Sequence, residues 1–261
     1  MTNYTIATEQ TLSLLAHLRI KADLELLPKY PYFFGKPYPL GRCCEIRDAV
    51  FEQLKVVLND GNNSEAATLR AYLAQGHSVN KIWGSLRGLY FQNALQIGDF
   101  YVDCANDTVN PNKPRIEILP MAESGFKYIT NFEDYAKIAE SYWEVRIYKN
   151  TVCTSLAPYF PILFLDKKNK SWLASNNYLF DIVKKSSFEE SERIIAKLPE
   201  IGIEHKVRWT ERLKQQESTE LLNNKHSAED YCKIYRDLSL HEDNSFRDKI
   251  VGAFTQVSSP V

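Results

Sequence analysis

A cysteine at the start of a predicted helix is the residue in this chain best placed for covalent chemistry. Cys43 follows a Pro-Gly approach in the run Tyr38-Pro39-Leu40-Gly41-Arg42-Cys43-Cys44-Glu45. The unpaired amides and partial positive charge of a helix N-terminus lower the pKa of a thiol and favour the nucleophilic thiolate. Gly41 lets the backbone pass close to a bound carbonyl, and the nearby amides can donate to an oxyanion. The alternative is that Cys43 or Cys44 packs as a small apolar side chain.

The downstream partner of this thiol is a carboxylate on a predicted β-hairpin. Alternating side chains up to Ile97 predict the first strand, Gly98-Asp99 predicts the turn, and the run from Phe100 to Asp103 predicts the second strand. A two-residue turn pairs Ile97 with Phe100 and Ala94 with Asp103. Asp103 is therefore expected where the second strand ends.

No histidine stands where such a thiol would need its base. The first hairpin strand offers Gln92 or Asn93, and an amide cannot take a proton at neutral pH. His77 is the nearest histidine in the sequence, but Gln75-Gly76-His77-Ser78 is typical of a helix end, where a histidine more often interacts with the helix dipole. No role is assigned to the other histidines, which are His17, His205, His226 and His241.

The run from Gly41 to Glu45 and the hairpin that ends in Asp103 resemble a known family. They are similar to the nucleophile helix and catalytic strands of the transglutaminase-like branch of the papain-type enzymes, over residues 37–105. The resemblance implies that Cys43 attacks an amide or ester carbonyl and that Asp103 orients a base. Gln92 or Asn93 then stands in the position of the family's histidine. The residues expected to bind the substrate are Phe34, Tyr38, Gly41, Cys44 and Asn93.

The sequence predicts no metal and no cofactor. The turn that carries Asp103, Asn106, Asp107 and Asn110 lacks the ligand spacing of a calcium loop and is interpreted as a turn network. There is no C-x-x-C pair for zinc. The glycine-rich phosphate loops and the G-x-S-x-G serine turn do not occur either, which disfavours nucleotide-dependent kinases and dehydrogenases.

The elements that must position the thiol predict an α+β fold, with N-terminal helices packed on a mostly antiparallel sheet and a helical C-terminal region. A helix is expected from Thr8 or Thr11 to Leu26, and a second one from about Cys43 to Leu58. Between them, three prolines, two glycines and five aromatic residues predict an ordered aromatic loop that forms a wall of a cleft. Further predicted elements are a helix over residues 64–76, a strand over 115–119, a helix over 132–141, strands over 142–148, 160–165 and 172–182, and a helix capped by Ser187 with Glu190 in the capping-box position.

Composition sets the domain organisation and the classes of partner. The chain has 261 residues, of which 44% are hydrophobic and 12% aromatic, so it can bury a substantial core. We predict a body over residues 1–186 that carries the candidate site, with a helical region over 187–261 packed on it. Because 32 basic residues face 33 acidic ones, no global field attracts nucleic acid or an anionic membrane, and neither is an expected partner.

Location is predicted from the absence of targeting features. Residues 1–9 lack the basic start and apolar stretch of a secretory signal, and no segment is apolar over the roughly eighteen residues that a membrane span needs. Five scattered cysteines do not form a secreted disulfide framework. A cytoplasmic protein with reduced thiols is expected.

Three functions fit these features, and the first makes the sharpest prediction. A divergent thiol hydrolase or acyltransferase, acting on an amide, ester or thioester, needs Cys43 in a cleft near Asp103 and an imidazole. A catalytically inactive protein of the same fold would bind a peptide or small molecule through the aromatic loop, with Gln92 or Asn93 facing Cys43 and no imidazole nearby. An accessory protein would bind another protein through its charged C-terminal helices, with an exposed apolar stripe near Leu221, Leu222, Tyr231 and Tyr235. The partner is thus a peptide, a protein or a small acyl substrate.

Overall fold

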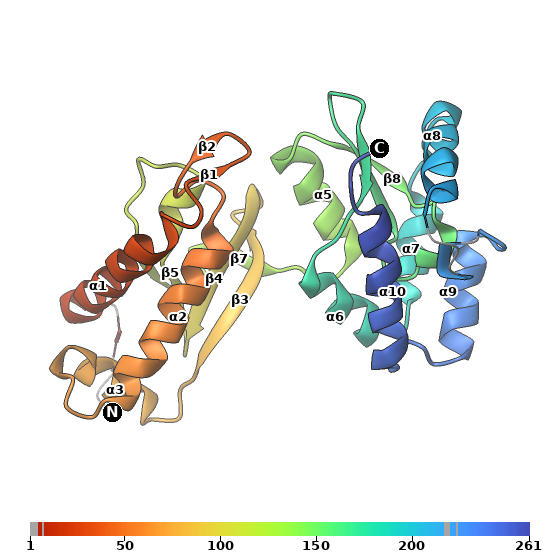
Figure 1. Cartoon of the computed structure of the whole chain (residues 1–261). Coiled ribbons are helices and arrows are strands. Elements are labelled where there is room, and N and C mark those ends of the chain that lie inside the picture. The colour runs from red at the N-terminus through yellow and green to blue at the C-terminus, as the bar shows by residue number, and fades with distance from the viewer. Residues whose placement is uncertain (1–4, 7, 217–219, 223) are drawn as a thin grey trace. The chain divides into compact units, whose positions relative to one another are not determined.

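The chain has an α+β fold that divides into two compact units, Met1–Tyr128 and Ile129–Val261. The computed structural model in Figure 1 describes residues 5–6, 8–216, 220–222 and 224–261. This division falls earlier than the boundary after residue 186 that composition predicts. It does so because the strands between residues 146 and 173 form a separate sheet with the C-terminal helices instead of extending the first sheet.

The first unit is an antiparallel sheet with helices packed on one face. The strand order is β6-β5-β4-β3-β7, and α1 and α2 contact each other while α2 lies on β4 (Figure 1). The core between these helices and the sheet is mostly aliphatic. The elements are α1 (Glu9–Leu26), β1 (Tyr32–Phe33), β2 (Lys36–Pro37), α2 (Cys43–Asn59), α3 (Ala67–Leu73), β3 (Val79–Leu86), β4 (Tyr90–Ile97), β5 (Phe100–Asp103), β6 (Glu117–Pro120), α4 (Met121–Ser124) and β7 (Phe126–Tyr128), with 3-10 turns η1 (Ser64–Ala66) and η2 (Asn106–Thr108).

Local sequence signals produce the elements around the thiol as predicted. The Thr8 hydroxyl accepts a hydrogen bond from the Thr11 amide at 3.2 Å and caps α1, whose buried side chains recur at three- and four-residue spacing. The second helix begins at Cys43. The Gly98-Asp99 turn pairs Ile97 with Phe100, which confirms the predicted register of the β4–β5 hairpin.

The second unit is a three-stranded antiparallel sheet, β10-β9-β8, with helices around it. The last helices form the helical C-terminal region that the sequence predicts. The elements are α5 (Phe132–Tyr142), β8 (Arg146–Lys149), η3 (Thr154–Leu156), β9 (Ile162–Leu165), β10 (Ser171–Leu173), α6 (Asn177–Lys185), α7 (Glu189–Lys197), α8 (Ile203–Lys214), η4 (Glu220–Leu222), α9 (Ala228–Asp237) and α10 (Asn244–Val257).

Two local predictions in this unit were wrong. The strand expected over residues 172–182 ends at Leu173, and α6 follows because the Asn176 side chain caps the Tyr178 amide at 2.9 Å. The cap expected at Ser187 is not formed. Phe188 is the residue before α7, in a left-handed conformation with φ +67°, and the Ser187 hydroxyl lies 3.0 Å from His241 Nε2 instead.

The apolar C-terminal residues expected on an accessory surface pack inside the second unit. Leu222, Tyr231 and Tyr235 are buried, and the Tyr235 hydroxyl donates to the Ser155 carbonyl at 3.0 Å. They therefore form no exposed stripe. Within the described part of the chain, no helix is long and apolar enough to cross a membrane.

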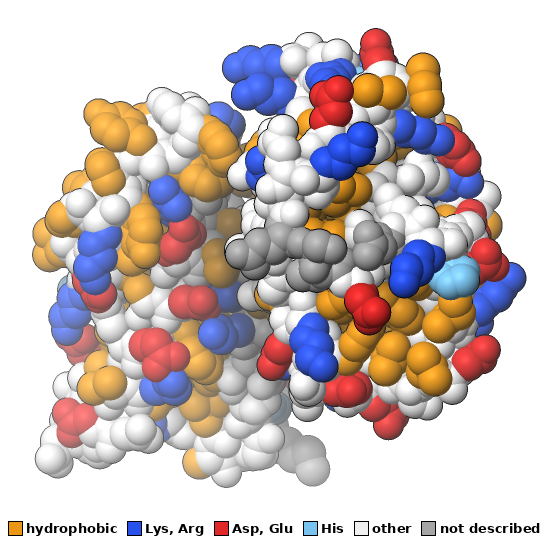
Figure 2. Space-filling model, turned by 45° about the vertical axis from the view of Figure 1, so that its right-hand side comes forward, with side chains coloured by type: hydrophobic (Ala, Val, Ile, Leu, Met, Phe, Trp, Pro, Cys, Tyr) orange, Lys and Arg blue, Asp and Glu red, His pale blue; other side chains and the backbone are white. Residues whose placement is uncertain are grey.

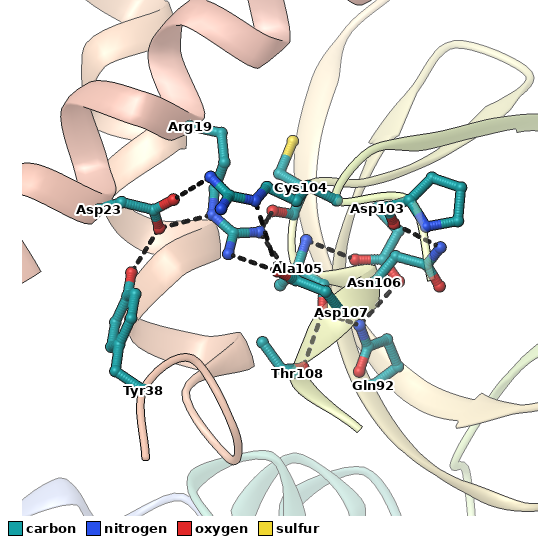
Figure 3. Close-up of polar contacts among 12 residues, drawn as sticks. Arg19, Asp23, Tyr38, Gln92, Asp103, Cys104, Ala105, Asn106, Asp107 and Thr108 are labelled. Carbon is teal, nitrogen blue, oxygen red and sulfur yellow. Dashed lines mark hydrogen bonds and ion pairs between the residues drawn. The ribbon is translucent and has the colours of Figure 1, made fainter. Parts of the chain in front are cut away.

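A buried ion pair ties α1 to the end of β5. Arg19 is 1% exposed, and its guanidinium donates to both carboxylate oxygens of Asp107, at 2.8 and 3.1 Å, and to the Cys104 carbonyl at 2.7 Å (Figure 3). Asp23, one turn further along α1, accepts from Arg19 Nε at 2.7 Å and from the Tyr38 hydroxyl at 2.6 Å. Burial lowers the pKa of Arg19, but the hydrogen bonds to Asp107 and Asp23 outweigh it and raise that pKa overall.

Removing the cation of this pair tests how much of the first unit depends on it. Replacing Arg19→Met removes the closest counter-charge of the buried Asp107 carboxylate and leaves it with Arg115, whose Nε lies 3.8 Å away. The free energy of unfolding in urea is therefore expected to fall by about 3 to 5 kcal/mol. Lys55→Met is the matched control, because it removes an exposed partner of Glu52 and changes little. Equal midpoints for the two variants would contradict the prediction.

Candidate functional site

Cys43 is the first residue of α2 and directly follows a turn at Gly41 and Arg42. Gly41 has φ +76°, a left-handed conformation that favours glycine, and its amide donates to the Thr108 carbonyl at 3.0 Å. Arg42 precedes the helix without a side-chain cap. The amides of Cys43 and Cys44 therefore find no acceptor among the described residues. Cys43 is half-buried and Cys44 is exposed.

Asn93 on β4 faces the thiol and presents a donor to it. Asn93 Nδ2 lies 3.3 Å from Cys43 Sγ, and Asn93 Oδ1 accepts from Arg47 Nη1 at 2.8 Å. A guanidinium can only donate, so Arg47 requires the amide oxygen on its own side and turns the NH₂ group toward the sulfur. The position at which a thiol would need a proton acceptor thus holds a fixed donor.

Neither thiol is activated by its surroundings. Burial raises the pKa of Cys43, and the hydrogen bonds from Asn93 lower it only in part. Burial also raises the pKa of Cys44, although the Arg47 guanidinium, 3.5 Å from that sulfur, acts in the opposite direction. The pKa of each thiol is therefore raised, whereas the position at a helix N-terminus predicts a lowered one.

Asp103 and Gln92 lie on the other face of the sheet. Side chains alternate along a strand, so Gln92 points away from the face on which Asn93 meets Cys43. Val102 belongs to the core beneath the helices, and by the same alternation Asp103 points away from it. Gln92 Nε2 donates to Asp103 Oδ2 at 2.7 Å. The structure thus brings Cys43 together with Asn93, and Asp103 together with Gln92, as two separate pairs.

The Asp103 carboxylate is fully buried with neutral donors only. The Tyr101 hydroxyl donates to it at 2.9 Å and the Ala105 amide at 2.7 Å. Burial raises the pKa of Asp103 to about 6, although these donors lower it, and the charge of Glu117 adds to the rise. Gln92 Oε1 is buried and has no hydrogen-bond partner among the described residues. The Gln92 amide is therefore only half satisfied.

The aromatic loop contains a short hairpin, β1–β2, which is anchored next to the thiol. The Phe33 ring covers Gly41, where an added Cβ would clash with a ring carbon. The Arg42 guanidinium lies over the rings of Phe33 and Tyr30, 4.7 and 4.9 Å from their centroids. Phe34 at the tip is 93% exposed. The hairpin is thus anchored at its base, while the tip residue Phe34 is exposed and its ring meets Phe33 edge-on.

Of the predicted substrate-binding residues, some lie beside the thiol and others do not. Asn93 and Cys44 lie beside Cys43 and Arg47, whereas Gly41 is covered by Phe33. The Tyr38 hydroxyl is turned to Asp23, and Phe34 faces solvent. The side chains expected to form one binding wall therefore do not all face the thiol.

No imidazole in the first unit serves as a base for Cys43. His17 Nδ1 lies 3.4 Å from Glu65 Oε2, and His77 stacks on Tyr72 at 4.0 Å between ring centroids. The other three histidines belong to the second unit. Over the described residues there is also no cluster of three or more His, Cys, Asp or Glu side chains that could hold a metal ion.

Two buried arginines hold the residues around the thiol in place, Arg47 through Asn93 and Arg19 through Asp107. Neither was singled out from the sequence. Arg47 lies four residues after Cys43, so both project from the same face of α2, and this spacing is visible in the sequence. Arg19 stands among the leucines of the buried stripe of α1, where a cation requires a buried carboxylate partner. Each arginine was identifiable as a buried cation, but its partner was not.

Comparisons with protein-family models, curated proteins and solved structures give no match to this chain.

The raised pKa of Asp103 predicts a pH dependence of stability. A carboxyl group with a higher pKa in the folded state contributes stability below pH 4 that is lost as the pH rises through about 6, up to about 3 kcal/mol. Asp103→Asn removes this loss, so its free energy of unfolding should rise relative to wild type between pH 4 and pH 7. Tyr101→Phe deletes one donor and should shift the loss to higher pH. Urea titrations at several pH values measure both, and a constant difference for Asp103→Asn would count against the prediction.

A pair of glycine variants separates the Phe33 contact from backbone strain. Gly41→Ala and Gly35→Ala both place a side chain at positive φ, +76° and +79°, but the Cβ meets the Phe33 ring only at position 41 and open space at position 35. Gly41→Ala should therefore lower the free energy of unfolding more than Gly35→Ala, by at least about 1 kcal/mol for the clash. Equal losses would mean that Phe33 is not held against the turn.

Proposed function

We propose that this chain is a catalytically inactive protein, with a site similar to that of thiol hydrolases, which binds a peptide or small molecule beside Cys43. The observation that carries the proposal is the Asn93 amide, which donates to Cys43 Sγ at 3.3 Å and is held in that orientation by Arg47. A thiol nucleophile needs an adjacent acceptor for its proton. Asn93 offers none, and the Gln92–Asp103 pair lies on the opposite face of β4.

The physical chemistry of the thiol supports binding over catalysis. The pKa of Cys43 is raised by burial, so the thiol form dominates at neutral pH. A hydrolase or acyltransferase would need a proton acceptor for Cys43. The two histidines of the first unit do not provide it, because His17 lies beside Glu65 and His77 stacks on Tyr72. Arg47 adds a further obstacle, because any side chain at position 93 must present an acceptor to it.

The groups proposed to bind the ligand are the backbone amides of Cys43 and Cys44 and the exposed Cys44 side chain. The amides of Cys43 and Cys44 point out of the first turn of α2, where the helix dipole favours a carbonyl or carboxylate oxygen. Cys44 is exposed beside the Arg47 guanidinium. A peptide carbonyl or a small acyl group fits this arrangement, without transfer to the sulfur.

Alkylation of the folded protein distinguishes this function from thiol catalysis. In a Cys44→Ser background, labelling of Cys43 by iodoacetamide is followed by peptide mass spectrometry across neutral and alkaline pH. The expected inflection lies above the value of about 8.5 for a free thiol, and Asn93→Ala moves it higher by removing the donor. An inflection well below 8.5 would overturn the proposal and favour the hydrolase.

Binding is tested with a peptide selected from a random phage-displayed library on the wild-type chain. Fluorescence polarisation of that peptide should give a Kd within about twofold for Cys43→Ser, because no covalent step is involved. Cys44→Trp fills the exposed position beside Arg47 and should weaken binding at least about tenfold. Loss of binding in Cys43→Ser, or no effect of Cys44→Trp, would contradict binding at this site.

A further inference from the structure

The tip of the β1–β2 hairpin carries an aromatic residue that folding alone does not favour. Phe34 has φ +48° and is followed by Gly35 at +79°, so the two form a tight turn of left-handed residues. Such a turn prefers Asn-Gly, and a bulky side chain in this conformation is strained. Phe34 is also 93% exposed. A phenylalanine is thus unfavourable at this position, because its backbone is strained and its apolar ring is exposed to water. This combination points to a role in binding another molecule.

Other exposed apolar side chains lie next to this tip in the chain. We call them the arm surface, and they are Leu24, Leu27, Tyr30, Tyr32 and Phe34, with exposed fractions of 73%, 49%, 38%, 67% and 93%. The Arg42 guanidinium contacts both the Tyr30 ring, which follows α1, and the Phe33 ring of the hairpin. Figure 2 shows hydrophobic side chains at the top of the first unit, the end at which Figure 1 draws the hairpin.

Exposed lysines flank the arm surface. Between residues 21 and 36 the chain carries Lys21, Lys29 and Lys36, all exposed, against one exposed acid, Glu25. The remaining acid, Asp23, is mostly buried and paired with Arg19 and Arg115. The exposed charges of this range therefore sum to +2, and to +1 when Asp23 is included, with Lys29 paired to Glu25 at 2.8 Å, whereas the whole chain has a net charge of −1. A local patch of this kind can act within a Debye length whatever the global charge is.

We propose that the arm surface docks on an anionic lipid bilayer, with Phe34 inserted at the interface. A protruding tip with one ring at its end needs a deep complementary pocket in a protein partner, whereas a bilayer accepts it without a preformed shape. Tyrosine and phenylalanine next to lysine are the side chains that combine apolar insertion with headgroup contact. Lysines near an anionic leaflet add electrostatic attraction. This membrane role goes beyond the ligand binding proposed beside Cys43 and does not depend on it.

Cosedimentation with vesicles tests the proposal on the full chain. The probes are vesicles of phosphatidylcholine alone and vesicles that also contain about 30% phosphatidylserine. Wild type is expected to bind the anionic vesicles, with binding reduced by added salt. Phe34→Ser should lower the partition coefficient at least about tenfold, and Lys36→Glu should lower it on anionic vesicles. Leu89→Ser is the matched control, because Leu89 is 64% exposed in the β3–β4 turn of the same unit, and it should bind as wild type does.

Phe34→Ser is not expected to unfold the chain, because its side chain is almost fully exposed, and circular dichroism checks this. The proposal is overturned if wild type binds neither vesicle, or if Phe34→Ser and Leu89→Ser bind equally. It is also overturned if a Phe34-dependent self-association appears in sedimentation velocity without vesicle binding, because the tip would then be a protein contact.

Discussion

The first unit depends on keeping one buried cation neutralised. Arg19 enters the core from α1, and the low dielectric there makes its charge costly unless carboxylates surround it. Asp107 provides the main one, and it lies on the turn that follows β5, so the ion pair fixes α1 against the exit of the hairpin (Figure 3). The same turn carries the Thr108 carbonyl that holds the Gly41 amide. The position of the thiol therefore follows from an ion pair that does not include it.

A second guanidinium decides what the thiol can do. Arg47 is buried on α2, one turn after Cys43, and it donates to the Ile82 carbonyl as well as to Asn93. Each buried N–H of an arginine needs an acceptor, because an unmet donor costs its full desolvation. Residue 93 is thus constrained by Arg47 before it is constrained by the sulfur. An asparagine satisfies the arginine with its oxygen and leaves only its NH₂ group for the cysteine.

The parts of the structure that could be predicted from sequence are those set by local rules. The cap at Thr8, the start of α2 at Cys43 and the Ile97–Phe100 pairing all depend on residues within a few positions of one another. The strand predicted where α6 lies was wrong because its apolar run fits both periodicities and Asn176 settles the choice. The main partner of Arg19, Asp107, is 88 residues away in the chain, and no local sequence pattern predicts a contact over that separation.

Alternation along β4 explains why the candidate site was only half predictable. Gln92 and Asn93 are adjacent in the sequence and equally able to stand for a missing base, but they belong to opposite faces of the sheet. The helix packing selects Asn93 for the thiol, and Gln92 is then free to bind Asp103. Arg42 connects α2 to the hairpin, since its carbonyl accepts the first helical bond from Ile46 while its guanidinium lies over the rings of Tyr30 and Phe33. The residue before Cys43 therefore contacts both the hairpin and the first turn of α2.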